Sequence, residues 1–327
     1  MTLKELGEFG LIGRIATSAG SGDGVALGIG DDAAAVIPSP GVQTLVTSDM
    51  LVEGVHFDLT FTPPLELGRK CLAVNLSDIA AMGGVPRFAL LSLAIPPTLS
   101  LEFLESFISG FTGCGAEQGV TLIGGDTCSS RSGFVVSVTL LGEQHASRIV
   151  RRSGAKTGDR IYVTGTLGDS ALGLNLLRRG ERGGAAIARH LDPAPRNLAG
   201  VALAEKGVAT AMIDVSDGLL ADLGHLLRLS GVGAELFLKN IPLSTEYLGW
   251  ISGVSDDPYS LATAGGEDYE LLFTSPPEQD AAVRELAAFL GLPMTVIGEI
   301  RSEPGLVIFA PDGTPHTPSC RGFDHFA

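Results

Sequence analysis

Seven aspartates of this chain stand among glycines and other small residues rather than among the Lys and Glu partners typical of a solvated helix face. Two carboxylates about 4 Å apart repel each other by some 4 kcal/mol at an effective dielectric of about 20, so such a cluster needs cations to stay ionised. Hard oxygen donors favour Mg²⁺ over zinc or copper. Taken singly, each aspartate is equally typical of a helix cap or a turn. Together they predict a magnesium site, and they are Asp31, Asp32, Asp49, Asp78, Asp126, Asp214 and Asp217.

The glycines beside these aspartates add a second kind of chemistry. Backbone N–H groups at glycine can approach phosphate oxygens closely, and Mg²⁺ can bridge those oxygens to carboxylates. The pattern therefore suggests an ATP site. The motif G-x-x-x-x-G-K-[ST] and the protein-kinase signatures are absent from the sequence, and Gly28-x-Gly30 is too short for a dinucleotide fingerprint. Any nucleotide site must therefore belong to another fold.

Composition narrows the class of protein. The 327 residues suggest two domains, and 45% apolar with 18% charged residues exclude wholesale disorder. Lys and Arg number 22 against 37 Asp and Glu, a net charge of −15 that argues against nucleic acid or an anionic membrane surface as a partner. The four cysteines form no C-x-x-C pair, and no apolar run reaches about 18 residues. We expect a cytoplasmic protein with reduced thiols.

The elements needed to hold these residues follow an α/β pattern. A basic, turn-forming stretch at 148–159 predicts a boundary between domains 1–148 and 149–327. In each half the acidic residues are expected at strand ends, and Asn75-Leu76-Ser77-Asp78 resembles Asp214-Val215-Ser216-Asp217, so both were expected to face one cleft. The main predicted helices are 67–82, 170 onward, 219–229, 278–290 and one capped by Ser100; the main predicted strands are 44–47, 88–95, 120–123, 134–141, 161–164, 210–213, 235–238, 269–274, 294–297 and 306–309.

Nine longer strings, in order along nearly the whole chain, resemble the thiamine-monophosphate kinase family. As a set, motifs of this length are highly specific. They are Gly28-Ile29-Gly30-Asp31-Asp32; Thr47-Ser48-Asp49 with Glu53-Gly54-Val55-His56-Phe57; 73–83, AVNLSDIAAMG; 123–127, IGGDT; 152–156, RSGAK; 163–170, VTGTLGDS; 213–219, IDVSDGL; 265–271, GGEDYEL; and 321–326, RGFDHF.

This resemblance implies a fold, a reaction and a site. The fold is the two-domain α/β architecture shared with aminoimidazole ribonucleotide synthetase, with an N-terminal domain that binds ATP and Mg²⁺ and forms a homodimer, and a C-terminal domain that completes the active site. The reaction is ATP-dependent phosphorylation of thiamine monophosphate to thiamine diphosphate. The implied metal ligands are Asp32, Thr47, Ser48, Asp49, Asp78, Asp126, Asp214 and Asp217; the ATP contacts are Gly125, Asp126, Arg152 and Ser216; the substrate contacts are His56, Glu267 and Phe323.

Two of these positions depart from the family pattern. Ser48 stands where threonine is usual, which keeps a hydroxyl, and Phe323 stands where Tyr or Trp is common, which keeps a ring without a polar group. Two also have simpler interpretations, since His56 is equally a turn residue and Phe323 a core residue that anchors the chain end. His190, His225 and the pair Arg178-Arg179 were assigned to the solvated surface, and Asp31, Asp169 and Asp268 to structural roles.

The implied chemistry suits the residues present. The acceptor is a phosphate oxygen already ionised at neutral pH, so no general base is needed. Catalysis comes from Mg²⁺ ions and cationic side chains that neutralise two approaching polyanions and hold them in line. We therefore assign the central catalytic roles to Asp49, Asp126 and Arg152.

Four alternatives remain open at this level. A selenophosphate synthetase would carry a reactive Cys or selenocysteine near a glycine-rich N-terminus, whereas the first cysteine here is Cys71, within a predicted helix. A hydrogenase-maturation relative would end in a reactive cysteine, whereas seven residues follow Cys320. The sequence around His56 and Gly266-Glu267-Asp268-Tyr269 argues against an aminoimidazole ribonucleotide synthetase. A non-catalytic nucleotide- or metal-binding protein of the same fold is separated from an enzyme only by turnover.

Overall fold

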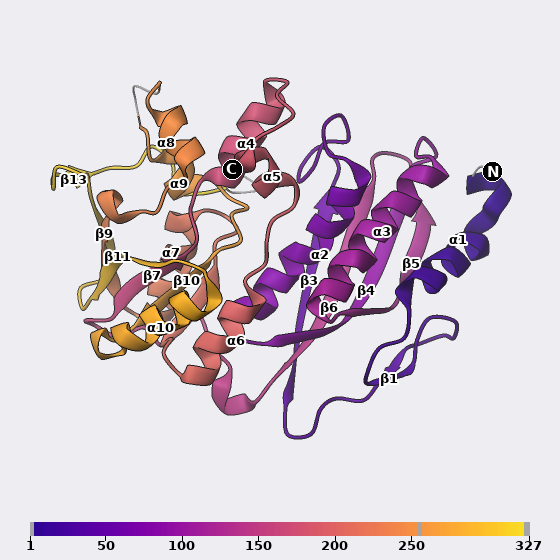
Figure 1. Cartoon of the computed structure of the whole chain (residues 1–327), viewed down its shortest axis with the longest axis horizontal. Helices are drawn as coiled ribbons and strands as arrows, with labels where there is room; N and C mark the ends of the chain where they lie inside the picture. Colours follow the sequence, from indigo (N-terminus) through magenta and orange to yellow (C-terminus); the bar gives the residue numbers. More distant parts are fainter. Residues whose placement is uncertain (1–2, 254–256, 324–327) are drawn as a thin grey trace. The chain divides into compact units, whose positions relative to one another are not determined.

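The computed structural model describes residues 3–253 and 257–323 (Figure 1). The chain forms two compact units. Unit 1 comprises Met1–Ile79 and Gly84–Ala146, and unit 2 comprises Ala80–Gly83 and Ser147–Ala327. Thr2 and Glu5 have the spacing of a capping box for a first helix, but Thr2 lies outside the described residues, as do Asp324, His325 and Phe326 of the last motif.

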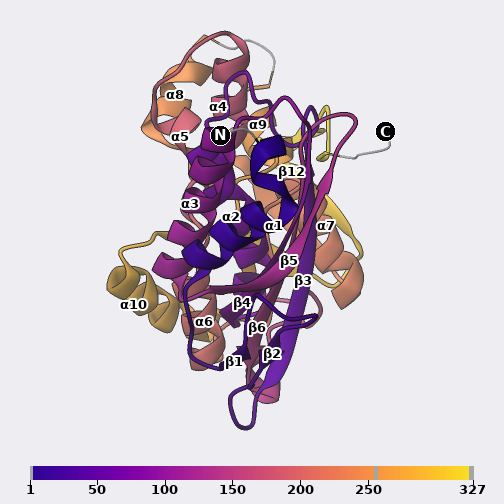
Figure 2. The same ribbon diagram turned by 90° about the vertical axis from the view of Figure 1, so that its right-hand side faces the viewer.

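Unit 1 is a four-stranded sheet with helices on one face. The sheet has the order β3-β6-β4-β5, in which only β4 and β5 are parallel. Figure 2 shows α2 and α3 on the same side of these strands. The elements are α1 (Leu3–Ala19), β1 (Val25–Leu27), β2 (Ala35–Val36), β3 (Gln43–Val52), α2 (Pro64–Ala81, whose last two residues belong to unit 2), β4 (Val85–Ile95), α3 (Leu101–Gln118), β5 (Thr121–Ser129) and β6 (Val135–Gln144).

The two long helices of unit 1 approach each other at glycines. A Cβ added at Gly68 of α2 would lie 2.0 Å from the Phe107 carbonyl oxygen, and one added at Gly110 of α3 would lie 1.9 Å from the Leu65 carbonyl oxygen. Ser100 caps α3 as predicted, because its hydroxyl accepts the Phe103 N–H. The two helices therefore pack with their backbones in close contact.

Unit 2 is a seven-stranded sheet between two cores. One core packs Leu219, Leu223 and neighbouring side chains against one face, and the other packs α6 and α10 residues, including Leu203 and Leu286, against the opposite face. The elements are β7 (Arg160–Thr164), α4 (Asp169–Arg178), α5 (Ala185–Leu191), α6 (Asn197–Lys206), β8 (Ala211–Asp214), α7 (Leu219–Ser230), β9 (Gly233–Phe237), α8 (Thr245–Ile251), α9 (Ser260–Ala264), β10 (Leu271–Ser275), α10 (Asp280–Leu290), β11 (Met294–Arg301), β12 (Gly305–Phe309) and β13 (Pro315–His316), with three short 3₁₀ helices at 146–148, 238–240 and 277–279.

The strand order of this second sheet interleaves the two halves of unit 2. The order is β13-β12-β9-β11-β7-β10-β8. β7 pairs with β10 and β11, β8 pairs with β10, and β9 pairs with β11 and β12. β7, β8 and β9 therefore pair with β10, β11 and β12, which come much later in the sequence.

The α/β fold class is confirmed, and three local expectations need correction. The strands predicted at 44–47 and 120–123 extend to Val52 and Ser129, so Asp49 and Asp126 lie within strands rather than at strand ends. Two helices that the sequence pattern did not indicate, α5 and α6, stand on either side of Pro193 and Pro195, which themselves lie in a loop as predicted. His190 of α5, assigned to the surface, is 3% exposed. Among the described residues, no helix has the length and apolarity needed to cross a membrane.

Candidate active site

In unit 1 the acidic residues of β3 and α2 meet. Thr47 and Asp49 alternate with exposed residues along β3, and the Thr47 hydroxyl donates to a carboxylate oxygen of Asp78 on α2. Burial, together with the nearby charge of Asp78, raises the pKa of Asp49 from 3.8 to about 6. A helix and a strand thus bring together two carboxylates that repel each other without a cation.

Ser48 faces the other way from its neighbours on β3. Its hydroxyl donates to the Val138 carbonyl oxygen at 3.2 Å and lies 3.1 Å from the Thr139 hydroxyl, both on β6. Successive strand residues point to opposite faces, which accounts for the separation from Thr47 and Asp49. The Ser48 hydroxyl therefore hydrogen-bonds within the sheet and points away from the side chains of Thr47 and Asp49.

His56 lies in the loop that follows β3. Its Nδ1 accepts the Val52 N–H at 3.0 Å, which places the proton of the neutral ring on Nε2. Nearby, a Glu53 carboxylate oxygen accepts the Phe134 N–H at 2.7 Å, and the Glu53 N–H donates to the Phe134 carbonyl oxygen at 3.0 Å. These bonds fix the loop to the start of β6. The Nδ1 atom of His56 takes part in the turn, and Nε2 is the polar atom on the other edge of the ring.

Gly125 and Asp126 are exposed residues in the middle of β5. Gly125 has φ +149°, and a Cβ there would lie 1.7 Å from the Leu91 carbonyl oxygen, so only glycine fits. In the sheet register Asp126 is opposite Ser92, and Asp49 is three strands away; at about 4.8 Å per strand this separation is about 14 Å. Asp126 therefore forms a position of its own rather than part of the Asp49–Asp78 pair.

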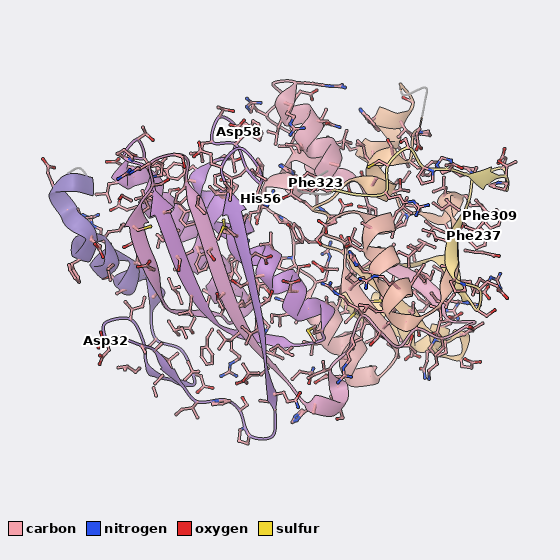
Figure 3. All side chains as sticks on the ribbon, turned by 180° about the vertical axis from the view of Figure 1, so that it is seen from behind. Asp32, His56, Asp58, Phe237, Phe309 and Phe323 are labelled. Atoms are coloured by element: carbon pink, nitrogen blue, oxygen red, sulfur yellow. The ribbon has the colours of Figure 1, made fainter. Side chains whose placement is uncertain are left out.

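Asp32 stands apart from both positions. It is exposed, and its backbone N–H donates to a carboxylate oxygen of Asp31 at 2.9 Å. Figure 3 shows it on the loop between β1 and β2, well away from His56. The structure does not bring Asp32 to the other predicted metal ligands of unit 1.

In unit 2 a four-residue loop between β8 and α7 carries the second acidic group. The backbone N–H groups of Ser216, Asp217 and Gly218 donate to one oxygen of Asp222, at 3.0, 3.1 and 3.2 Å. Burial raises the pKa of Asp222 from 3.8 to about 7, and the charges of Asp214 and Asp217 act in the same direction. The carboxylates of Asp214, Asp217 and Asp222 thus lie close together. The Asp222 carboxylate also fixes the loop that carries Asp217.

The same loop gathers two predicted substrate contacts from distant parts of the sequence. The Glu267 N–H donates to the Ser216 carbonyl oxygen at 2.7 Å, and the Phe323 N–H donates to the Asp217 carbonyl oxygen at 2.9 Å. Gly322 allows this return, since its φ is +147° and a Cβ there would lie 2.8 Å from the Asp217 carbonyl oxygen. The Phe323 side chain is 55% exposed, so it does not fill a core.

Arg152 lies in unit 2, on the exposed segment that precedes β7. The preceding carbonyl oxygen, of Arg151, accepts the Met212 N–H at 2.9 Å, two residues before Asp214. Arg152 is thereby held alongside β8, the strand that ends at the acidic loop.

Comparison with known proteins now identifies the chain's relatives. Residues 30–144 match the family "AIR synthase related protein, N-terminal domain", and residues 156–310 match "AIR synthase related protein, C-terminal domain". The thiamine-monophosphate kinase of Salmonella typhimurium is 42% identical over 98% of each chain.

The chain belongs to the thiamine-monophosphate kinase family.

Solved structures agree with this assignment to the thiamine-monophosphate kinase family. The thiamine-monophosphate kinase of Stenotrophomonas maltophilia K279a has a TM-score of 0.84 at 39% identity and covers 97% of this chain and 99% of its own. AaThiL complexed with AMPPCP and TMP has a TM-score of 0.78 at 37% identity and covers 100% of this chain and 99% of its own.

The side chains of this member of the thiamine-monophosphate kinase family can be compared with the donors that Mg²⁺ requires. Within 3–253 and 257–323, no group of three or more His, Cys, Asp and Glu side chains is arranged to hold a metal ion. The Asp49–Asp78 pair nevertheless supplies two carboxylates and the Thr47 hydroxyl. Mg²⁺ in phosphoryl-transfer sites is commonly bound by one or two carboxylates plus substrate phosphates. The donor set therefore fits Mg²⁺ held jointly by protein and nucleotide.

Sequence reasoning missed a buried group that supports the Glu267 segment in this member of the thiamine-monophosphate kinase family. The fully buried Glu270 accepts hydrogen bonds from Arg189 at 2.6 Å, from Arg196 at 2.5 and 2.7 Å and from the Thr164 hydroxyl at 2.7 Å. Asp268 accepts the Gly168 and Ser170 N–H groups at 2.7 and 3.2 Å. Burial raises the pKa of Asp268 to about 8.

Two sequence signals point to missed residues. Asp222 interrupts the apolar face of α7, where Leu219, Leu223 and Leu226 are buried. His190 occupies the i+4 position from the buried Ala186 on α5. A polar residue in an apolar periodic position is costly to bury without a partner, and so it indicates a specific buried contact.

Proposed function

We propose that this chain catalyses the ATP-dependent phosphorylation of thiamine monophosphate to thiamine diphosphate. One observation carries the proposal: the Ser216–Asp217 loop is hydrogen-bonded to both Glu267 and Phe323, in a chain similar over its whole length to AaThiL, which was solved with AMPPCP and TMP. An acidic loop and two candidate substrate contacts thus lie together in unit 2.

The proposed reaction is a direct transfer. A phosphate oxygen of thiamine monophosphate attacks the γ-phosphorus of ATP, the bond from that phosphorus to the β-phosphate oxygen breaks, and ADP leaves with its electron pair. The attacking oxygen is already ionised at neutral pH, so the chain needs no general base. Its task is to position the two polyanions and offset their repulsion.

We assign the residues as follows. Mg²⁺, when bound, would neutralise phosphate charge, and Gly125 would offer its backbone to the nucleotide. Arg152 would supply a cation to the phosphates. For Mg²⁺ we propose the side chains of Thr47, Asp49, Asp78, Asp126, Asp214 and Asp217, with Ser48 acting through its backbone oxygen because its hydroxyl faces β6, and with Asp32 at a separate position. For ATP we propose Gly125, Asp126, Arg152 and Ser216, and for thiamine monophosphate His56, Glu267 and Phe323.

The deciding experiment measures turnover. Purified chain is incubated with ATP, Mg²⁺ and thiamine monophosphate, and thiamine diphosphate is quantified by chromatography. Formation of one thiamine diphosphate per ADP supports the proposal. The same incubation in excess chelator should give no product, and rapid-quench analysis should detect no phosphorylated protein. ADP release without thiamine diphosphate, or no turnover at all, would contradict the assignment.

We also propose that unit 1 forms a homodimer through its sheet. Val46 and Met50 on the outer face of β3 are 65% and 59% exposed, while Leu45 and Leu51 on the inner face are buried. Within the part of unit 1 that the structure describes, no helix covers this outer face, and an apolar face of a sheet is stabilised by a second copy. Light scattering should show a dimer, and Met50→Glu should shift the mass toward the monomer; an unchanged mass would refute this face as the interface.

A further inference from the structure

A histidine buried in unit 2 touches the Glu267 carboxylate. His190 lies on α5 and is 3% exposed. Its Nδ1 is 3.0 Å from the Ser170 hydroxyl oxygen and 3.4 Å from a carboxylate oxygen of Glu267. One ring nitrogen therefore faces two oxygens that come from sequence positions 20 residues before it and 77 residues after it.

A proton on Nδ1 of His190 suits both of these oxygens. A ring nitrogen without a proton would direct its lone pair at the Glu267 carboxylate, which repels it. With the proton on Nδ1, the ring donates to the Ser170 hydroxyl oxygen at 3.0 Å and attracts the Glu267 carboxylate oxygen at 3.4 Å.

The backbone around Glu267 is fixed independently of its side chain. Glu267 and Tyr269 have φ of +66° and +50°, and they are the non-glycine residues with positive φ in the described part of the chain. Such a conformation persists only where surrounding structure determines it. Here the Glu267 N–H is bound to Ser216, Asp268 binds the first turn of α4, and Glu270 is buried between two arginines.

The Glu267 carboxylate has a buried imidazole beside it, because His190 Nδ1 lies 3.4 Å from one of its oxygens and His190 is 3% exposed. We propose that His190 is a positioning residue that holds the Glu267 carboxylate in the orientation that recognises thiamine monophosphate. The inference rests on the proposed function for the role of Glu267, and on geometry alone for the role of His190.

The matched test compares two amide variants of His190. In His190→Asn the amide nitrogen takes nearly the place of Nδ1, so a donor to Glu267 is kept; in His190→Gln the amide reaches the place of Nε2 and that donor is lost. Steady-state kinetics should show KM for thiamine monophosphate raised about tenfold in His190→Gln and less than about threefold in His190→Asn, with KM for ATP unchanged in both. His225→Gln, on α7, is the control for a histidine remote from Glu267.

A double-mutant cycle then tests whether His190 acts through Glu267. In a Glu267→Ala background, His190→Gln should change KM for thiamine monophosphate by less than about twofold, because the group it positions is gone. An undiminished tenfold effect in that background would overturn the proposal. So would equal KM values in His190→Asn and His190→Gln, or a rise in KM for ATP that matches the rise for thiamine monophosphate.

A structural measurement separates this proposal from the proposed function. Wild-type chain that makes no thiamine diphosphate contradicts the function, and His190 is then judged from crystal structures of the two variants. The Glu267 carboxylate should keep its place in His190→Asn and move away in His190→Gln. An unmoved carboxylate in His190→Gln would overturn the positioning role whatever the enzyme's activity.

Discussion

Asp222 should make the stability of unit 2 fall as pH rises. Its pKa is about 7 in the folded chain against an ordinary 3.8, so between these values the folded state binds more protons than the unfolded state. Stability is then lost as pH rises through this window. At about 1.4 kcal/mol per pH unit, the unfolding free energy should fall by roughly 2 to 3 kcal/mol from about pH 5 to about pH 7.5.

Asp222→Asn isolates this contribution because the amide never ionises and its oxygen still accepts backbone N–H groups. The gap in unfolding free energy between variant and wild type should therefore move in favour of the variant by roughly 2 to 3 kcal/mol between the two pH values. Unfolding in urea can be followed by the fluorescence of Trp250, the one tryptophan of the chain, which packs against the core of unit 2. Excess chelator is included, since a cation beside Asp214 and Asp217 would stabilise the ionised form. A gap that is the same at both pH values would refute the reasoning.

Three further substitutions have defined outcomes. Asp49→Asn should abolish thiamine diphosphate formation while the melting temperature stays the same or rises, because the repulsion from Asp78 is removed; a wild-type rate would make Asp49 a structural residue. Phe323→Ala should raise KM for thiamine monophosphate about 2- to 30-fold with KM for ATP unchanged, the loss expected for one cation–π contact; unchanged kinetics with a lower melting temperature would contradict a substrate contact. Gly125→Ala should lower the melting temperature by at least about 4 °C, as its Cβ would meet a carbonyl oxygen at 1.7 Å, whereas Gly113→Ala on α3 meets nothing within 4 Å and serves as the control; equal melting temperatures would show that β5 relaxes around the added methyl group.

Local signals in the sequence were sufficient for helices such as α3 and α7 and for the acidic loop of unit 2. Ser100 marks the start of α3 because a hydroxyl at that position caps a helix, and the apolar spacing from Leu219 marks α7. The Asp214–Asp217 loop follows directly from a short apolar strand. These features depend on residues that are close together in the sequence. Apolar periodicity and helix capping are patterns of such neighbouring residues, so they can predict these features.

Contacts between distant segments were beyond such signals. β3 continues through Asp49 because β6 pairs with it along its whole length, although Ser48 and Asp49 are poor strand formers. His190 is buried by partners 20 and 77 positions away, and Glu270 by arginines 74 and 81 positions away. The assignment of Asp32, Asp126 and Arg152 to ligands likewise stays a prediction, because it depends on groups that the chain alone does not supply.

The interleaved sheet of unit 2 has a consequence for how the chain is made. β7, β8 and β9 find all their partners among β10, β11 and β12, so no pair of this sheet can form until residues from Leu271 onward have been synthesised. Until then three apolar strands have unpaired edges, a condition that favours slow folding and association with other nascent chains. Unit 1 completes its own sheet at Gln144 and has no such delay. We therefore expect unit 2 to set the rate of refolding and to be the part of the molecule on which chaperones act.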